Sequence, residues 1–273
     1  MINKITTADD ALSVLRDGMC IAANFWGPGT PNYLWHMLMH RNVKGLTICV
    51  NNYVPKTDNT REKGAPDPSL VLSQTKKIIS AFTARPRDDL PVMKEIMKRV
   101  TEGTLEFESM SHGILIERLL AGALRLGGIY CPIGTGTIIE EGKEKRIING
   151  KEYVFQEPLI PDVGLISAAK ADKFGNLLYH GTARANNPII AMASRYTIAE
   201  VFEIVDELEP DHIVTPGIFV DKIVRIPEDD TASKQRRMEW IRASISYREQ
   251  QKLDEAAEIE AARGIIYERP TDR

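Results

Sequence analysis

Short apolar runs alternate with amphipathic stretches along most of the chain. Apolar runs bounded by turn residues predict strands at 19–23, 46–50, 77–82, 105–110, 163–168 and 197–204. Apolar positions at helical spacing predict helices around 34–39 and at 90–100, 113–126 and 188–194, and Thr7 with Asp10 forms a capping pattern for an earlier helix. This alternation favours an α/β fold with an open, mostly parallel sheet covered by helices.

Two segments depart from the alternation. In the middle of the chain, Asn149-Gly150 separates two strand-like runs, which predicts a small β-hairpin insertion with a type I′ turn. From Glu228 to Arg263 the chain is rich in charged residues and alanine, which predicts one long, solvated C-terminal helix. We therefore divide the chain into a domain of residues 1–227 and a charged helical extension of residues 228–273.

The composition is that of an ordinary globular protein, with 43% hydrophobic and 27% charged residues among 273. A net charge of −3 provides no broad basic field, so nucleic-acid binding is not expected. No run approaches the roughly 18 consecutive apolar residues of a membrane-spanning helix. The first twelve residues lack an apolar core behind a basic start, so a signal peptide is not expected. We expect no membrane association and a cytoplasmic location.

Neither a metal site nor a disulfide framework is expected. Cys20, Cys49 and Cys131 lie in separate apolar runs without CxxC spacing, which is typical of buried free thiols. His36 and His40 are one helical turn apart, but no third ligand accompanies them. The chemistry must come from other residues.

Several blocks of sequence carry recognisable motifs in a fixed order. Residues 112–118 read His-Gly-Ile-Leu-Ile-Glu-Arg, and residues 131–137 read Cys-Pro-Ile-Gly-Thr-Gly-Thr. Further on come Lys-Ala-Asp-Lys-Phe-Gly-Asn at 170–176, Gly-Thr-Ala-Arg at 181–184, Asn-Pro at 187–188 and Thr-Ile-Ala-Glu-Val at 197–201. In this order they resemble the alpha subunits of family I coenzyme A (CoA) transferases. The resemblance covers roughly residues 11–226 and implies the broad fold that CoA transferases share with ribose-phosphate isomerases.

The segment at 23–31 is similar to a further family signature, Gly-Gly-Phe-x-x-x-Gly-x-Pro, in a degraded form. Ala23 and Asn24 replace both leading glycines and close backbone space that glycine leaves open. The resemblance implies that Phe25, Gly27 and Gly29 bind substrate or CoA. The departure points to a substrate other than the usual short 3-oxo acid.

The resemblance also implies covalent catalysis, in which a glutamate forms an anhydride and then a glutamyl-CoA thioester. In the family this glutamate lies in a Ser-Glu-Asn-Gly motif on the beta chain, and the present sequence contains no Glu-Asn-Gly. The chain is therefore expected to require a separate beta subunit. The resemblance implies an acyl-CoA and a carboxylic acid as substrates, and no permanently bound cofactor.

His112 occupies the position of a family glutamine that is thought to reach the thioester carbonyl. The resemblance implies that the imidazole N–H stabilises negative charge on that oxygen. The alternative is a histidine at a helix start that bonds its own backbone. Nearby, Gly134, Thr135 and Gly136 follow an apolar strand and form either a loop of the acyl or CoA pocket or a tight turn.

The remaining candidates also have ordinary structural interpretations. Lys170 and Asn176 either line the pocket or belong, with Asp172, to a salt-bridged turn. Arg184 and Asn187 offer donors for a carboxylate or for pantetheine amides, although Asn-Pro is also a common helix start. A solvated or structural role, rather than an acid–base pair, is favoured for three glutamates: Glu106, Glu108 and Glu117.

Two other functions are compatible with the same fold. One is a component of an acyl-CoA hydrolase or ring-cleaving enzyme, in which the partner lacks the catalytic glutamate, so the partner's sequence distinguishes it. The other is a non-catalytic sugar-phosphate-binding module, because one broad fold hosts unrelated functions. Stabilisation by a sugar phosphate but not by CoA esters would support that module.

Overall fold

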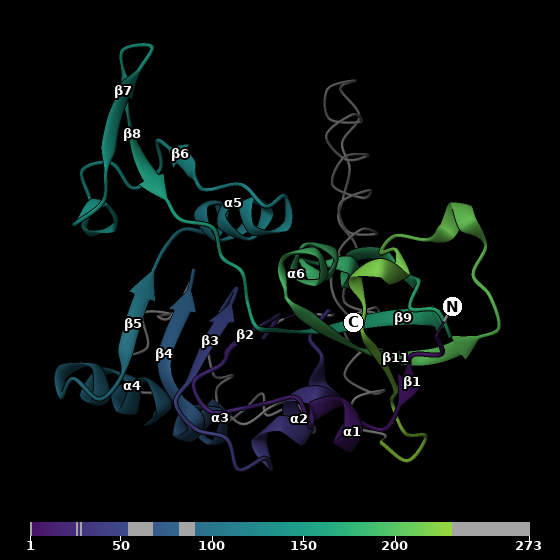
Figure 1. Ribbon diagram of the computed structural model, residues 1–273. Helices are drawn as coiled ribbons and strands as arrows, with labels where there is room; N and C mark the ends of the chain where they lie inside the picture. The colour runs from purple at the N-terminus through teal and green to yellow at the C-terminus, as the bar shows by residue number, and fades with distance from the viewer. Residues whose placement is uncertain (1, 26, 28, 54–67, 82–90, 231–273) are drawn as a thin grey trace, which may run out of the picture.

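The computed structural model describes residues 2–25, 27, 29–53, 68–81 and 91–230. A large sheet crosses the molecule with helices on both faces, and a smaller sheet projects from one side (Figure 1). Within the described ranges, no helix is both long enough and apolar enough to cross a membrane.

Among the described residues, the large sheet has nine strands, in the order β1-β12-β11-β9-β2-β3-β4-β5, with β10 paired to β9 beside this path. Every pair along the path is parallel, and β10 is antiparallel to β9. The open, mostly parallel sheet expected from the sequence is therefore confirmed. Its strands are β1 (Ile5–Thr6), β2 (Cys20–Ala23), β3 (Leu46–Val50), β4 (Thr75–Ser80), β5 (Glu106–Ser109), β9 (Val163–Asp172), β10 (Leu177–Leu178), β11 (Tyr196–Val205) and β12 (Lys222–Arg225).

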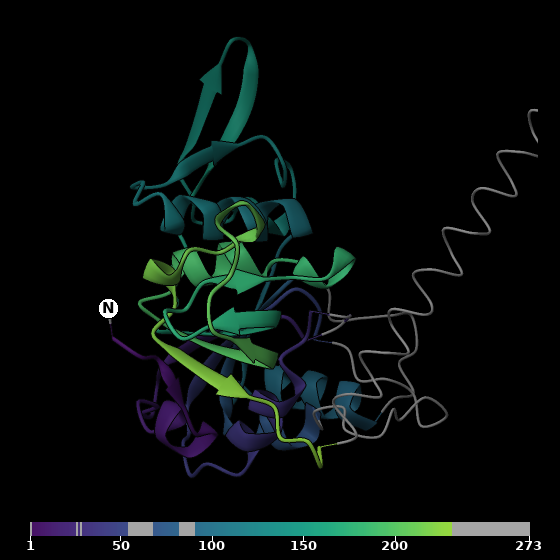
Figure 2. The same ribbon diagram turned by 90° about the vertical axis from the view of Figure 1, so that its right-hand side faces the viewer.

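Helices α1 to α4 cover one face of this sheet, and α5 and α6 cover the other (Figures 1 and 2). Successive strand residues point to opposite faces, so Ile21 and Ala23 enter one apolar core while Ala22 enters the other. The helices are α1 (Ala8–Leu12), α2 (Asn32–Met39), α3 (Pro68–Gln74), α4 (Pro91–Thr101), α5 (His112–Ala123) and α6 (Asn187–Ala193). Short 3-10 turns are η2 (Ile138–Glu140), η3 (Gly181–Arg184), η4 (Pro210–His212) and η5 (Gly217–Phe219).

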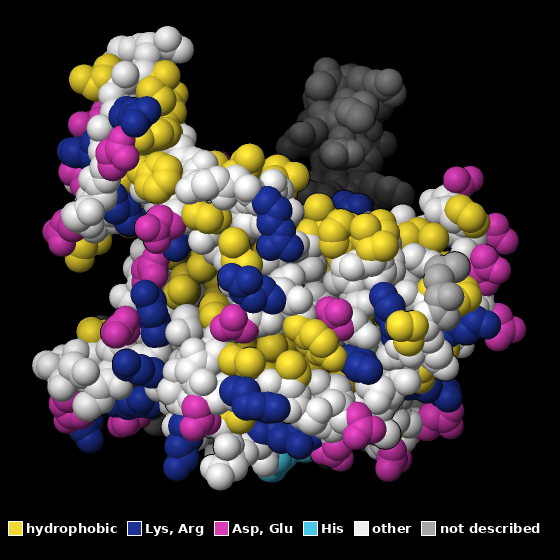
Figure 3. Space-filling model, viewed as in Figure 1, with side chains coloured by type: hydrophobic (Ala, Val, Ile, Leu, Met, Phe, Trp, Pro, Cys, Tyr) yellow, Lys and Arg dark blue, Asp and Glu magenta, His cyan; other side chains and the backbone are white. Residues whose placement is uncertain are grey.

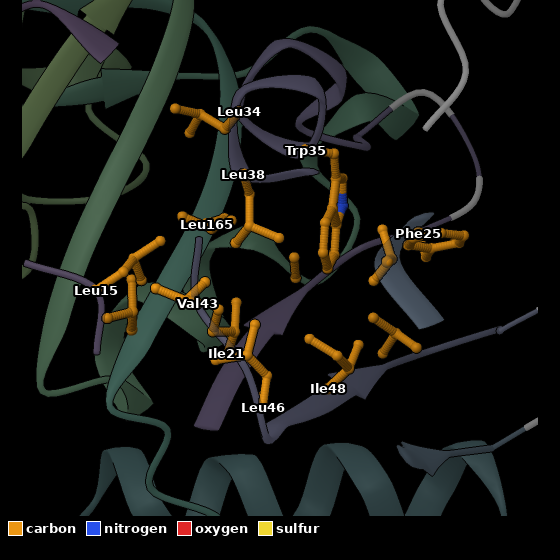
Figure 4. Packing of buried hydrophobic residues seen from close by; sticks show 14 of the residues in the cluster. Leu15, Ile21, Phe25, Leu34, Trp35, Leu38, Val43, Leu46, Ile48 and Leu165 are labelled. Atoms are coloured by element: carbon orange, nitrogen blue, oxygen red, sulfur yellow. The ribbon is translucent and has the colours of Figure 1, made fainter. Parts of the chain in front are cut away.

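Helix α2 is anchored by its inner face. Trp35 and Leu38 point from the helix toward Ile21 and Ile48 of the sheet (Figure 4), and Leu34 is buried in the same cluster. Residues three and four apart share one face of a helix, and burying a leucine there stabilises the fold by roughly 1.5–3 kcal/mol. This packing also fixes the end of the loop that enters α2.

The smaller sheet is antiparallel and consists of β6 (Ile129–Cys131), β8 (Lys151–Gln156) and β7 (Lys145–Ile148). Between β7 and β8, Asn149 and Gly150 have φ of 52° and 75°, which a type I′ turn requires, so the predicted hairpin is confirmed. Every residue of β7 is exposed, and apolar side chains are visible on this projecting part (Figure 3).

Other expected elements are confirmed with small shifts. The Thr7 hydroxyl accepts a hydrogen bond from Asp10 N at 3.1 Å and caps α1 as predicted. Helix α5 ends at Ala123 instead of 126, because Arg125 adopts φ 58° and Leu126 N donates to Ala121 O at 2.9 Å. Strand β9 continues past 168 because it pairs with β11 over its whole length. Among the helices and strands of the described residues, four were not predicted: β1, β10, β12 and α3. Strands β1 and β10 have two residues each, which is too short to show a period.

The long helix expected over 228–263 lies outside the described residues from position 231 onward. Glu228 and Asp229 form a turn directly after β12. The division into 1–227 and 228–273 stays a prediction.

Candidate active site

The carboxyl ends of β2 and β9 form the switch point of the large sheet. From β2 the chain proceeds outward through β3, β4 and β5, whereas from β9 it proceeds in the opposite direction through β11 and β12. In open parallel sheets, the crevice at such a point is the usual ligand site. The loop at 24–31 and the start of α6 meet here.

Asn187, the first residue of α6, is the centre of a buried hydrogen-bond network at this point. Its Nδ2 lies 3.1, 3.1 and 3.2 Å from the carbonyl oxygens of Gly29, Ser167 and Ala183. Its Oδ1 accepts from Asn24 Nδ2 at 3.1 Å and from Ser167 N at 3.4 Å. The amide therefore ties the loop at 24–31 to β9 and to η3. Direct contact between Asn187 and a ligand stays a prediction.

Phe25 packs into the core that underlies the loop. Its ring stacks on Tyr53 with centroids 5.2 Å apart and meets Trp35 edge-on at 5.1 Å. Its backbone N–H donates to Asn51 Oδ1 at 3.2 Å. These contacts fix the first part of the loop, and contact between Phe25 and substrate or CoA stays a prediction.

Gly27 and Gly29 of this loop are glycines for different structural reasons. Gly27 has φ 99°, which L side chains rarely adopt, and its carbonyl accepts from Thr30 N at 3.1 Å. At Gly29, an added Cβ would lie 2.6 Å from Ala183 O, so glycine allows the loop to approach η3. Both residues lie in the loop that follows β2 at the switch point, and their contact with substrate or CoA stays a prediction.

Arg184 and the strained residue after it belong to the segment that packs against Gly29. Arg184 is exposed at the end of η3. Ala185 follows with φ 40° and ψ −133°, and its Cβ lies 2.9 Å from the position a Cβ on Gly29 would take. A non-glycine residue in this region costs on the order of 1–3 kcal/mol, and such residues cluster at functional sites. Arg184 is thus placed beside loop 24–31, with its side chain accessible.

His112 lies at the other end of the site, where α5 begins after β5. Ser111 caps the helix, because its Oγ accepts from Ile114 N at 3.1 Å. In the described part of the chain the exposed imidazole of His112 makes no hydrogen bond, so the self-capping interpretation is not supported. A Cβ on Gly113 would lie 3.4 Å from Ile133 Cδ1, which places His112 next to the 134–137 loop.

The 134–137 loop is a turn that bonds to itself. Gly134 and Gly136 have φ of 93° and 74°, and Thr135 Oγ1 donates to Pro132 O at 2.9 Å. Gly136 N donates to Glu140 Oε2 at 2.7 Å, which fixes the loop on η2. The segment is therefore a tight turn beside His112, and whether it also lines the acyl or CoA pocket stays a prediction. Figure 3 shows the molecule hollowed on this side, between the small sheet and the sheet edge that carries β5.

Within this chain, His112 and Asn24 mark two separate regions of the candidate site. Strand β5 is three strand spacings from β2, which is about 14 Å. Since a CoA thioester is a long molecule, one substrate can contact both.

Arg118 links α5 to the sheet, a role that sequence reasoning missed. Its Nη1 contacts Glu108 Oε1 at 2.5 Å and its Nε donates to Glu157 O at 2.8 Å, while Lys77 Nζ lies 3.0 Å from Glu108 Oε2. These charges lower the pKa of Glu108, although its partial burial opposes them. The structural role favoured for Glu108 is confirmed, and the network fixes the helix that carries His112.

Lys170 and Asn176 lie away from both the Asn24 region and the His112 region. Lys170 is five residues beyond Leu165, which pairs with the last residue of β2, and therefore about 16 Å further along β9. It pairs with Glu203 on β11 at 2.8 Å, so the expected salt bridge to Asp172 is wrong. Asp172 instead accepts from Asn176 Nδ2 at 2.8 Å, and the turn itself is confirmed. The structure does not bring Lys170 and Asn176 together with the other candidates.

Glu200 is a fully buried carboxyl on β11 that sequence reasoning did not single out. It accepts from Leu34 N at 2.8 Å, in the first turn of α2, and from Tyr33 N and the Ser167 hydroxyl. Burial raises its pKa from 4.5 to about 8, against the lowering effect of these hydrogen bonds. The one signal in the sequence is a charged residue inside the otherwise apolar run 198–201.

The raised pKa predicts a specific pH dependence. Between pH 4.5 and about 8 the unfolded chain releases the Glu200 proton while the folded chain keeps it, so folding stability falls as pH rises through this window. We expect wild type to lose stability relative to Glu200→Gln between pH 5 and 8, on the order of 2–4 kcal/mol at about 1.4 kcal/mol per pKa unit. Urea unfolding at both pH values measures this, and a pH-independent difference would contradict it.

The three cysteines do not provide a nucleophile. Burial raises the pKa of Cys20 to about 12 and raises the pKa values of Cys49 and Cys131 as well. All three are free thiols, as expected, and only the thiolate is strongly nucleophilic. None is a thiolate near neutral pH.

Fold and site together define an α/β protein of the class that gathers its functional loops at the carboxyl ends of parallel strands. Residues 5–225 match the family model described as Coenzyme A transferase, and the chain belongs to this family. The alpha chain of the acetate CoA-transferase of Escherichia coli (strain K12) is 36% identical over 227 residues, covering 82% of this chain and 97% of the relative. The alpha chain of the acetoacetyl-CoA:acetate/butyrate CoA transferase of Clostridium acetobutylicum is 35% identical over 231 residues, covering 83% and 100%.

A solved structure agrees with the fold. Glutaconate coenzyme A-transferase from Acidaminococcus fermentans has a TM-score of 0.66 at 20% identity, over 82% of this chain and 76% of that one. The resemblance stated from the motifs and the CoA-transferase activity it implied are confirmed. The sugar-phosphate module and the hydrolase are not favoured.

Proposed function

We propose that this chain is the alpha-type half of a heteromeric enzyme that moves CoA from an acyl-CoA to a carboxylic acid. The covalent glutamyl-CoA thioester forms on a separate beta subunit. Membership of the family without a Glu-Asn-Gly motif is the observation that carries this proposal. The relatives named as alpha chains support it, since such names belong to proteins that assemble with another chain.

In this proposal His112 donates a hydrogen bond to the thioester oxygen, beside the Gly134, Thr135 and Gly136 turn. The loop at 24–31 and Arg184 form the second contact region, and Lys170 and Asn176 contact only a distant part of the substrate. The CoA thioester is a substrate, and no cofactor stays bound. The cytoplasmic location stays a prediction.

The products of the reaction test the proposal. With the partner present, the acyl-CoA donor and a carboxylic acid are expected to give the thioester of the acceptor acid and the free donor acid, with no release of CoA thiol. Chromatography of the CoA esters and a thiol assay measure both. Release of free thiol at the rate of donor loss would instead support the hydrolase.

A further inference from the structure

Asn24 is fully buried, yet it keeps one hydrogen-bonding atom without a partner. Its Nδ2 donates to Asn187 Oδ1 at 3.1 Å and lies 3.4 Å from Gly29 O. Its Oδ1 has no partner in the described part of the chain, and the residue is 0% exposed. A buried, unpaired acceptor costs about 1–3 kcal/mol, so such an atom requires an explanation.

The hydrogen-bond network shows that the free atom is the oxygen. The Nδ2 of Asn187 faces the carbonyl oxygens of Gly29, Ser167 and Ala183, which only a donor can do. The Oδ1 of Asn187 therefore faces Ser167 N and Asn24. Since two oxygens cannot share this contact, the NH₂ group of Asn24 must face Asn187, and its Oδ1 must point elsewhere.

The side chain that carries this oxygen is a departure from the family signature. Asn24 directly follows β2 at the switch point, and it replaces a glycine of the family signature, which has no side chain to offer. The acceptor is thus buried at the carboxyl end of β2, the part of such sheets at which ligands usually bind. Its side chain faces Gly29 of the same loop and Asn187 of α6.

We propose that Asn24 Oδ1 accepts a hydrogen bond from the bound thioester and thereby sets substrate specificity. This proposal rests on the CoA-transferase function above. The donor is an O–H or N–H group, which has two possible sources: a hydroxyl on the acyl group or an amide of the pantetheine arm. A site built to bond such a donor rejects the analogue that lacks it, because the buried acceptor is then left unpaired.

Two substrate pairs and two variants test the proposal in the assembled enzyme. The first pair is 3-hydroxybutyryl-CoA against butyryl-CoA; the second is the acetyl thioester of N-acetylcysteamine against its analogue with the amide replaced by an ester. The variant is Asn24→Gly. The control is Gln74→Ala. Like Asn24, Gln74 is a buried amide whose oxygen has no partner in the described part of the chain, and its Nε2 donates to Leu38 O and Arg41 O. Gln74 lies on α3.

Wild type and Gln74→Ala are expected to prefer the donor-bearing member of one pair by about tenfold in kcat/KM, and Asn24→Gly is expected to lose that preference. The pair that responds identifies the source of the donor. If Asn24→Gly slows all four substrates equally, Asn24 only positions the loop and the proposal is wrong. If the wild-type complex transfers no CoA, that outcome contradicts the proposed function alone. The preference within each substrate pair is then measured as a ratio of binding affinities, which still tests the role of Asn24.

Discussion

His112→Ala, assembled with the partner chain, is expected to lower kcat about 100-fold. Removing one donor to a developing oxyanion costs roughly 3 kcal/mol of transition-state stabilisation, which corresponds to that factor. Stability should change little, because Ser111 and not His112 caps α5, and the imidazole is exposed. Steady-state kinetics and thermal unfolding of the same preparations measure both effects.

The matched control is His36→Ala, which removes an exposed histidine from α2. It should keep normal turnover, because α2 and α5 lie on opposite faces of the sheet. If His112→Ala also keeps near-normal turnover, His112 does not contact the thioester oxygen.

The chain without its partner is expected to transfer no CoA, and mixing the two chains should restore activity from background. The three thiols have raised pKa values and Glu108 is paired with Arg118, so none of these groups is an activated nucleophile. Covalent catalysis supplies most of the rate in a two-step transfer, so the loss should be nearly complete. Rates from the chain alone, from the partner alone and from a titration of one into the other measure this. Full activity in the chain alone would contradict it.

Much of the fold could be predicted because it depends on local patterns. Apolar runs bounded by turn residues located β2, β3 and β11, and Asn149-Gly150 located the hairpin, because a type I′ turn needs positive φ at both residues. Motif order located the residues at the switch point without any knowledge of which strands are neighbours.

The polar network could not be predicted, because it joins residues far apart in sequence. Asn187 bonds Gly29 across 158 positions, and Glu200 bonds Leu34 across 166. Such partners are fixed by the strand order, which places β9 beside β2. Likewise, Lys170 belongs to a motif block with Asp172, yet alternation along β9 and its register with β11 pair it with Glu203.

The most direct test of the account is to identify the residue that carries the covalent intermediate. The two chains are incubated together with an acyl-CoA, reduced with borohydride and digested, and the modified peptide is located by mass spectrometry. The account predicts a modified glutamate on the partner and an unmodified peptide map for this chain. Modification of any residue of this chain would contradict the assignment of this protein as the half that binds and polarises the thioester.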